Sequence, residues 1–152
     1  METLDGIDRK ILNALQENAA LSLDQLGDAI GLSRNACWRR VKMMEASGVI
    51  SKRVALVDPD KVGLGLMVFM QVRTNSHDPD WQKAFSNATN AISGILSVYR
   101  MTGDLDYLIR ARVSGMADYD RLYQQLITRL PIADIAASFV MEKIKDSTAL
   151  IL

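Results

Sequence analysis

The stretch SRNACWRRVKMMEASGVISKRVALVDP, residues 33–59, has basic and apolar residues in helical order, then a glycine, then residues typical of strands. At about 100° per residue, one side of the predicted helix is apolar and is expected to pack. That side carries Cys37, Val41 and Met44. The opposite side carries only hydrogen-bond donors and amides at positions i, i+4 and i+7: Asn35, Arg39 and Lys42, with Arg34 near the first turn.

The outward side of this helix favours contact with an anionic polymer. Residues 33–53 contain six basic side chains and one acid, Glu45, which falls on another side of the helix. Asn and Arg can make paired hydrogen bonds to adenine and guanine edges, and Lys and Arg can neutralise phosphates. The alternative is a solvated helix face. Such faces usually mix charges of both signs, so the pattern favours nucleic-acid binding.

The residues before this stretch predict two more helices. An apolar stripe from Leu4 to Leu15 is typical of an amphipathic helix ending near Asn18. Ser22 can cap a shorter helix that Gly31 ends, and Ser33 caps the next helix after a two-residue break. A short turn with a glycine between two helices is typical of a helix-turn-helix.

The residues after the third helix predict a wing. Two short strands, Val49–Ile50 and Val54–Val57, would flank the basic residues Lys52 and Arg53, which would lie near phosphate. The stretch DPDKVGLGL, residues 58–66, reads as a hinge. We therefore predict a DNA-binding domain at 1–57, a hinge at 58–66 and a second domain at 67–152.

The second domain alternates strands and helices. The predicted order is strand, helix, strand, strand, helix, strand, at 66–74, 80–91, 95–101, 107–113, 117–130 and 135–141. This βαββαβ order is the ferredoxin-like arrangement, so the fold class is α+β.

Composition excludes several functions. The 152 residues include one cysteine and one histidine, Cys37 and His77, which predicts no metal cluster, no cofactor site and no catalytic pair. An enzyme of ferredoxin-like fold would need a general acid or base, so we expect no catalytic residues. No apolar run reaches the length of a membrane span and no signal peptide is present, so a cytoplasmic protein is expected.

The connection Met101 to Tyr107, MTGDLDY, has two interpretations. It is either an ordinary tight turn or a binding loop. In the second case, N–H groups around Gly103 would receive a carboxylate, and Asp104 or Asp106 would accept from an ammonium group, which suits a zwitterionic amino acid.

Several motifs in order resemble the leucine-responsive/asparagine-operon (Lrp/AsnC) family of transcription regulators. They are LDGIDRKILNALQENAALSLDQLGDAIGLS, CWRRVKMMEASGVI, VALVDPDKVGLGL, RMTGDLDYLIR and SFVMEKIK. The CW pair and the SHDPDW loop are most similar to the cysteine-responsive branch. The resemblance implies a winged helix-turn-helix joined to a ferredoxin-like domain that binds effectors and dimerises, with dimers commonly assembling into octamers.

The resemblance also implies the site residues. Contacts with double-stranded DNA are expected from the helix beginning at Ser33 and from the wing: Ser33, Arg34, Asn35, Arg39, Arg40, Lys42, Lys52 and Arg53. An amino-acid effector, with cysteine and leucine the first candidates, is expected between dimers at Thr102, Gly103, Asp104, Asp106, Tyr107, Ser138 and Phe139.

Three places depart from the family pattern. The recognition helix begins Ser33-Arg34-Asn35-Ala36, so its operator preference is not inherited from relatives. The loop at residues 131–134 is shortened by one residue, and the chain stops after ALIL. We therefore predict a sequence-specific DNA-binding regulator that responds to an amino acid or related metabolite. The alternative is an architectural DNA-binding protein without an effector.

Overall fold

The computed structural model describes residues 4–152, which form two compact units. The helical unit contains residues 4–56 and 145–152, and the sheet unit contains residues 57–144. The sequence analysis places residues 145–152 in the second domain, but in the structure these residues contact the helical unit. The chain therefore passes between the units twice.

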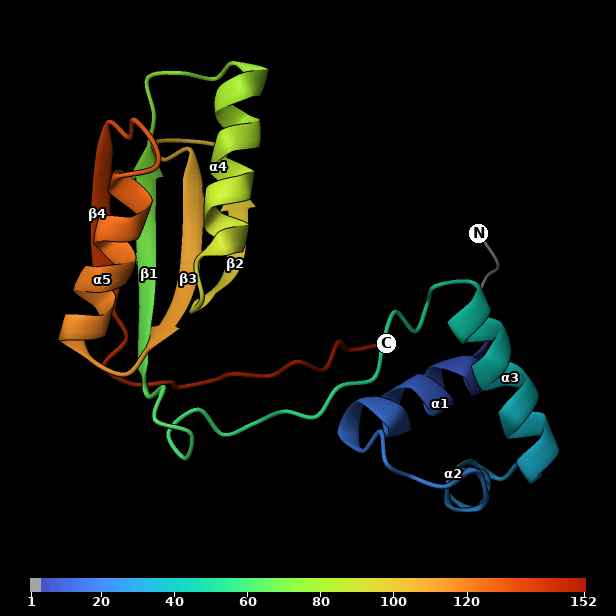
Figure 1. Cartoon of the computed structure of the whole chain (residues 1–152). Helices are drawn as coiled ribbons and strands as arrows, with labels where there is room; N and C mark the ends of the chain where they lie inside the picture. The colour runs from blue at the N-terminus through green and yellow to red at the C-terminus, as the bar shows by residue number, and fades with distance from the viewer. Residues whose placement is uncertain (1–3) are drawn as a thin grey trace. The chain divides into compact units, whose positions relative to one another are not determined.

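The helical unit is built from α1 (Gly6–Glu17), α2 (Leu23–Ile30) and α3 (Arg34–Ala46) (Figure 1). Side chains cap the first turn of each helix. Asp5 and Ser22 form reciprocal capping boxes with the third residue of α1 and α2, and the Ser33 hydroxyl accepts from the N–H of Ala36 at 3.3 Å. The core is small, and its buried hydrophobic residues are Ile11, Leu12, Leu26, Cys37, Val41 and Met44.

Gly27 fixes the corner between α2 and α3. Its carbonyl accepts from the N–H groups of Gly31 and Leu32 at 2.8 and 2.9 Å. A Cβ atom at Gly27 would lie 2.5 Å from the carbonyl oxygen of Leu32. Glycine is therefore required here because the turn backbone occupies the space of a side chain.

The C-terminal residues lie along α1. The Gln16 side chain donates to the carbonyl oxygen of Leu150 at 3.0 Å and accepts from the Leu150 N–H at 2.7 Å. One amide thus pairs with both backbone groups of one residue, as a neighbouring β-strand would. These two bonds attach the end of the chain to the first helix.

The two predicted wing strands are absent: residues 51–58 have no regular structure. Isolated two-stranded hairpins are marginal in water, and although Ile50 packs against the helical core, the side chains of the second predicted strand find no partner among residues 4–152 that would bury them. Val54, Leu56 and Val57 are 57%, 74% and 66% exposed. The expected position of Lys52 and Arg53 at the tip of a hairpin is therefore wrong for this chain alone.

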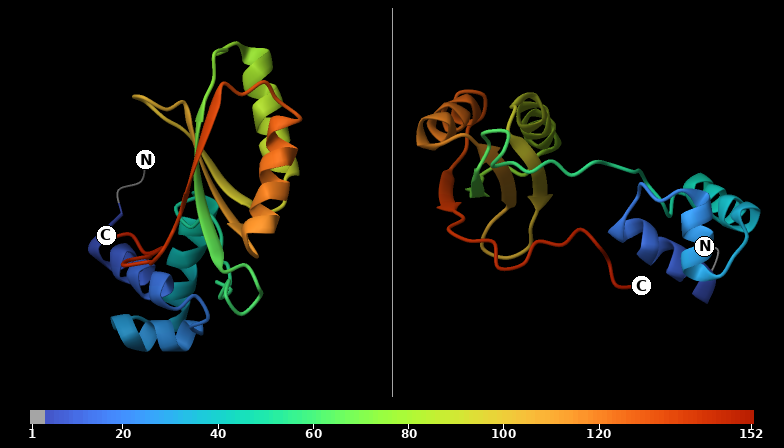
Figure 2. Two further views of the ribbon diagram at one scale, coloured as in Figure 1. Left: turned by 90° about the vertical axis from the view of Figure 1, so that its left-hand side faces the viewer. Right: turned by 90° about the horizontal axis from the view of Figure 1, so that it is seen from below.

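The sheet unit confirms the predicted βαββαβ order. It consists of β1 (Leu66–Arg73), α4 (Pro79–Ala91), β2 (Ile95–Arg100), β3 (Tyr107–Val113), α5 (Met116–Ile127) and β4 (Asp134–Phe139). The strand order is β2-β3-β1-β4, and all neighbours are antiparallel. Both helices cover the same face of the sheet, which the right-hand view of Figure 2 shows end-on.

Alternation along the strands positions the core between the sheet and its two helices. Val68, Met70 and Val72 of β1 point to the helices and are fully buried. The predicted last strand extended to Met141, but β4 ends at Phe139, opposite Val68. The Val140 N–H still donates to the Met67 carbonyl at 3.0 Å, but no backbone hydrogen bond beyond it continues the pairing in the described residues, and Met141 is fully exposed.

The predicted hinge is partly folded. Leu64 donates its N–H to the carbonyl of Pro59 at 2.8 Å, which closes a turn. The Arg112 guanidinium donates to the carbonyl oxygen of Gly65 at 3.1 Å. The end of this segment is thus tied to β3.

Candidate functional site

One side of α3 is buried and the opposite side is exposed, as the sequence predicts. Cys37, Val41 and Met44 are buried, and burial raises the pKa of the Cys37 thiol, which suits a packing residue. Asn35 and Arg39 are exposed on the opposite side. Among residues 4–152 neither forms an ion pair or a side-chain hydrogen bond. An exposed amide and guanidinium without partners are available to an external acceptor.

Arg40 is engaged inside the helical unit. Its guanidinium lies 2.8 Å from Asp5 and 2.7 Å from Asp8, both at the start of α1. The N–H of Asp8 and the Arg40 guanidinium hold the pKa of the Asp5 carboxyl below its usual range. The guanidinium thus links α3 to the N-terminus of α1, a structural role that its place among the basic residues did not indicate.

Glu45 does not lie apart from the basic residues as expected. Its carboxylate accepts from Lys42 at 2.9 Å and from Arg53 at 3.1 Å. The Lys42 ammonium, followed by the charge of Arg53, lowers the pKa of Glu45. Arg34 lies 3.8 Å from Asp24, with both side chains about two-thirds exposed. Exposed pairs of this kind are weak and exchange readily for phosphate.

The sequence reasoning missed Trp38. This side chain is 53% exposed although it is large and apolar. It precedes Arg39 and follows Asn35 by three residues, which places it on the outward side of α3. The same helical arithmetic that selected Asn35 would have found it. An exposed indole between donors can make apolar contact with a thymine methyl group.

The β2–β3 connection is a loop with free donors. The N–H of Met101 bonds to the carbonyl of Asp106 at 2.8 Å and closes the loop. In the described chain, the N–H groups of residues 102–105 donate no hydrogen bond. Gly103 has φ +102°, a conformation that side chains disfavour. This geometry leaves consecutive N–H groups able to receive an anion.

The two aspartates of the loop are in different situations. Asp106 accepts from the N–H of Thr74 at 2.8 Å and lies 3.7 Å from His77, so its carboxylate anchors the loop to the end of β1. The Asp104 side chain is exposed, while its carbonyl accepts from Arg73 at 2.9 Å. Of the two loop aspartates, therefore, only Asp104 has a carboxylate without a partner in the described residues.

The other predicted effector residues lie elsewhere in the sheet unit. The Tyr107 ring packs into the core, 4.4 Å from Phe85 between ring centroids. Phe139 packs edge-on against Tyr119 on the helix side, and Ser138 points to the opposite face. In register, the loop abuts Val72, whereas Phe139 lies opposite Val68, four residues or about 13 Å away. One chain does not bring these residues together.

Two further classes of site have no support in the described residues. Within residues 4–152 no group of three or more His, Cys, Asp and Glu side chains can hold a metal ion. In the same range, every helix is too short or too polar to cross a membrane.

A helix-turn-helix with an outward donor face, joined to a ferredoxin-like unit with an open loop, defines a DNA-binding regulator with a ligand-binding domain. Residues 4–51 match the winged helix-turn-helix DNA-binding family model, and residues 67–150 match the Lrp/AsnC ligand binding domain. The chain belongs to the Lrp/AsnC family and is a DNA-binding transcription regulator.

Relatives with known roles match nearly end to end. The glutamate uptake regulatory protein of Zymomonas mobilis is 44% identical over 97% of this chain and 90% of its own length. The DNA-binding transcriptional activator DecR of Escherichia coli is 40% identical over 97% of both chains. The regulator NMB0573 of Neisseria meningitidis, solved with L-Met, superposes with a TM-score of 0.93 at 34% identity, over 97% and 96% of the two chains.

Proposed function

We propose that α3 reads DNA through Asn35, Trp38 and Arg39, and that the sheet unit controls this binding in response to an amino acid. The observation that carries the proposal is the contrast within α3 between a fully packed side and an outward side whose Asn35 and Arg39 have no partner in the described chain. In a two-fold dimer, two such helices would meet successive major grooves roughly 34 Å apart.

The proposed DNA contacts differ in kind. Asn35 and Arg39 would read base edges, and Trp38 would contact a thymine methyl group. Phosphate contacts would come from the more exposed, weakly paired groups: Ser33, Arg34, Lys42, Lys52 and Arg53. Arg40 is left out of this set because two carboxylates of α1 already engage it.

The test for base reading uses DNA sites that the protein itself selects from a random pool. Arg39→Ala should weaken binding to the selected site by about 1–3 kcal/mol while changing binding to scrambled DNA little. Arg121→Ala is the control because Arg121 lies on α5 and, among residues 4–152, pairs only with Asp118. An equal loss on both DNAs that shrinks with added salt would assign Arg39 to phosphate. Unchanged binding to both would remove Arg39 from the interface.

For the effector, we propose a zwitterionic amino acid at the loop 102–106. The unbonded N–H groups would receive its carboxylate, and the free Asp104 carboxylate would pair with its ammonium group. Cysteine and leucine are the first candidates, since the motifs resemble the cysteine-responsive branch and the leucine-responsive family. Methionine and glutamate join them because the Neisseria relative was solved with L-Met and the Zymomonas relative regulates glutamate uptake.

We propose that a second chain completes this site. Along the sheet, Ser138 lies about 10 Å and Phe139 about 13 Å from the loop, so another subunit would have to supply them. The sheet face away from α4 and α5 carries side chains suited to packing against a copy of itself, including Met67, Phe69, Tyr99 and Leu108. Dimers through this face, assembling further to octamers, would bring loops and strand ends of neighbouring chains together.

A thermal-melt panel against the twenty amino acids at millimolar concentration tests the effector. A ligand at a hundred times its dissociation constant stabilises by about 2.7 kcal/mol. Asp104→Ala should abolish the shift while leaving the melting temperature without ligand unchanged. Asp106→Ala should lower that melting temperature, because it removes the anchor to Thr74. A panel without any shift would favour an architectural DNA-binding protein instead.

A further inference from the structure

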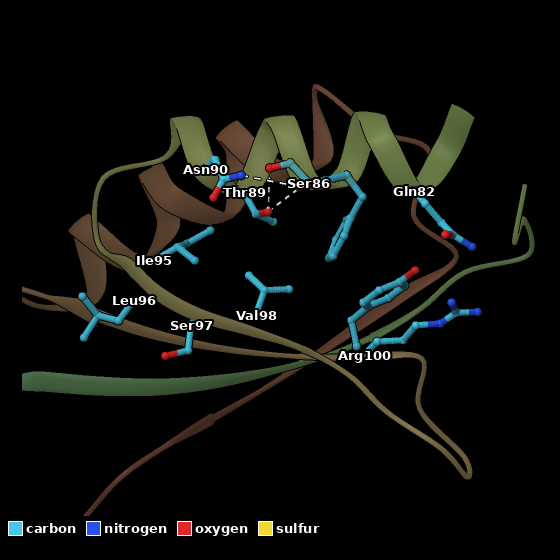
Figure 3. A pocket seen from close by; sticks show the side chains of 11 residues that line it. Gln82, Ser86, Thr89, Asn90, Ile95, Leu96, Ser97, Val98 and Arg100 are labelled. Atoms are coloured by element: carbon cyan, nitrogen blue, oxygen red, sulfur yellow. Dashed lines mark hydrogen bonds between the residues drawn. The ribbon is translucent and has the colours of Figure 1, made fainter. Parts of the chain in front are cut away.

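The sheet unit contains a second concave site, a cleft between α4 and the edge strand β2 (Figure 3). It encloses about 470 Å³, within the size range of small-molecule sites. The pairing of β2 with β3 is irregular between Ile95 and Ser97. This bulge turns Ile95 and Val98 toward α4, where they form an apolar floor, while Ser97 points away (Figure 3).

One end of the cleft carries unpartnered polar groups. Tyr107 is 93% buried, lines the cleft, and its hydroxyl makes no hydrogen bond to any residue of the described chain. Arg100 is the direct strand neighbour of Tyr107 and lines the same cleft. Within residues 4–152, Arg100 forms no ion pair. A hydroxyl and a guanidinium on directly paired strand residues can together receive a carboxylate.

The other residues that line the cleft indicate that its ligand has no ammonium group. No Asp or Glu is found among the cleft residues of the described chain, so no carboxylate there would neutralise an ammonium group. At the end opposite Arg100, the Asn90 amide donates to the Ser86 hydroxyl at 3.4 Å, so these groups partner each other. The cleft therefore differs from the loop 102–106, where Asp104 is free to accept.

We propose that the α4–β2 cleft binds a small monocarboxylate with an apolar body and no ammonium group, such as a branched 2-oxo acid. The carboxylate would lie between Arg100 and the Tyr107 hydroxyl, and the apolar body along Ile95 and Val98. This assigns Tyr107 to the cleft and not to the amino-acid site. The site is additional to the loop and does not depend on it.

The test is titration calorimetry of the full chain with three probes that share one branched skeleton. They are 4-methyl-2-oxopentanoate, L-leucine, which has an ammonium group, and 4-methyl-2-pentanone, which lacks the carboxylate. The oxo acid is expected to bind through the cleft, and the ketone roughly tenfold to a hundredfold more weakly, because it loses a charge-assisted hydrogen bond.

Variants separate the cleft from the loop. Arg100→Met keeps the aliphatic stem and should weaken the oxo acid roughly tenfold or more, and Tyr107→Phe about three- to tenfold without disturbing ring packing. Arg121→Met is the matched control on α5. Asp104→Ala should leave oxo-acid binding unchanged while removing the amino-acid response, so either proposal can fail without the other.

Three outcomes would overturn the proposal. The first is no heat or melt shift with millimolar oxo acid. The second is binding that survives Arg100→Met and Tyr107→Phe together. The third is L-leucine binding that Arg100→Met weakens as strongly, which would show that the cleft does not exclude the ammonium group.

Discussion

The helical unit buries six hydrophobic side chains in its core, and the sheet unit buries fourteen. The sheet unit adds stacked aromatics, with Trp81 and Phe85 5.0 Å apart between ring centroids. The helical unit instead relies on polar devices: two capping boxes, the pairing of Arg40 with two aspartates, and the attachment of Gln16 to Leu150. A small core leaves a small margin of stability, which local polar contacts must supplement.

The largest expected effect compares one isoleucine in each unit. Ile11 and Ile109 are both fully buried, and truncation to alanine should cost about 2–5 kcal/mol in either place. In the helical unit this loss should bring unfolding near room temperature and abolish DNA binding, whereas the sheet unit should remain folded with Ile109→Ala. Calorimetry should show two transitions, of which Ile11→Ala lowers only the first. A single transition that both variants shift equally would contradict the comparison.

The corner glycine should give the next largest effect. Gly27→Ala places a methyl group 2.5 Å from the Leu32 carbonyl and should destabilise the helical unit by about 1–3 kcal/mol. Gly6→Ala is the matched control, because a Cβ atom there meets nothing within 4 Å. Chemical denaturation of both variants measures the difference. Equal midpoints would mean that the turn relaxes around the added methyl group.

Two neighbouring arginines should separate stability from DNA binding. Arg40→Met should lower the melting temperature of the helical unit, because it leaves Asp5 and Asp8 facing each other without a cation. The loss should be smaller at high salt. Arg39→Met should leave the melting temperature unchanged and weaken DNA binding. If Arg40→Met weakened DNA binding at unchanged stability, Arg40 would belong to the interface after all.

The smallest expected effect is on the stability of the helical unit at acidic pH. The pKa of Asp5 is below its usual value of 3.8, so its ionised form stabilises the folded unit. This stabilisation is fully present above pH 3.8 and is lost as the pH falls through the lower, folded-state value. Asp5→Asn should therefore flatten the stability of the helical unit below about pH 4. Melting curves from pH 5 to pH 2 measure this, and an unchanged slope in the variant would assign the acid response elsewhere.

Periodic features of the sequence predicted most of the fold. The stripe from Leu4 to Leu15 and the alternation of Tyr107 to Val113 depend on local order alone, and both elements formed where expected. The two predicted wing strands did not form, because a hairpin needs burial that Val54, Leu56 and Val57 do not find within the described chain. Local patterns carry no information about partners that only a longer assembly or a distant segment provides.

In the candidate sites, too, local sequence patterns predicted which residues are exposed but not their distant partners. The outward position of Asn35 and Arg39 followed from helical spacing. The partners of Arg40 lie 32 and 35 residues away, and no pattern around Arg40 indicates them. The cleft beside β2 depends on a register shift at a single position, which the sequence of an edge strand does not specify. Contacts between distant residues and irregular pairing therefore had to come from the structure.

The attachment of the C-terminal residues to α1 has a consequence for which substitutions the chain tolerates. Within the described part of the chain, the Gln16 side chain bonds only to main-chain atoms of Leu150, so every residue type but one can replace Leu150 without loss of these bonds. Proline has no N–H to offer, and a library saturating position 150 should be depleted of proline alone. At position 16, in contrast, the side chain itself is constrained. The contact needs a side-chain amide of the length of glutamine, which both donates and accepts. Selection should therefore act on residue 16 and not on residue 150, although both residues form the contact.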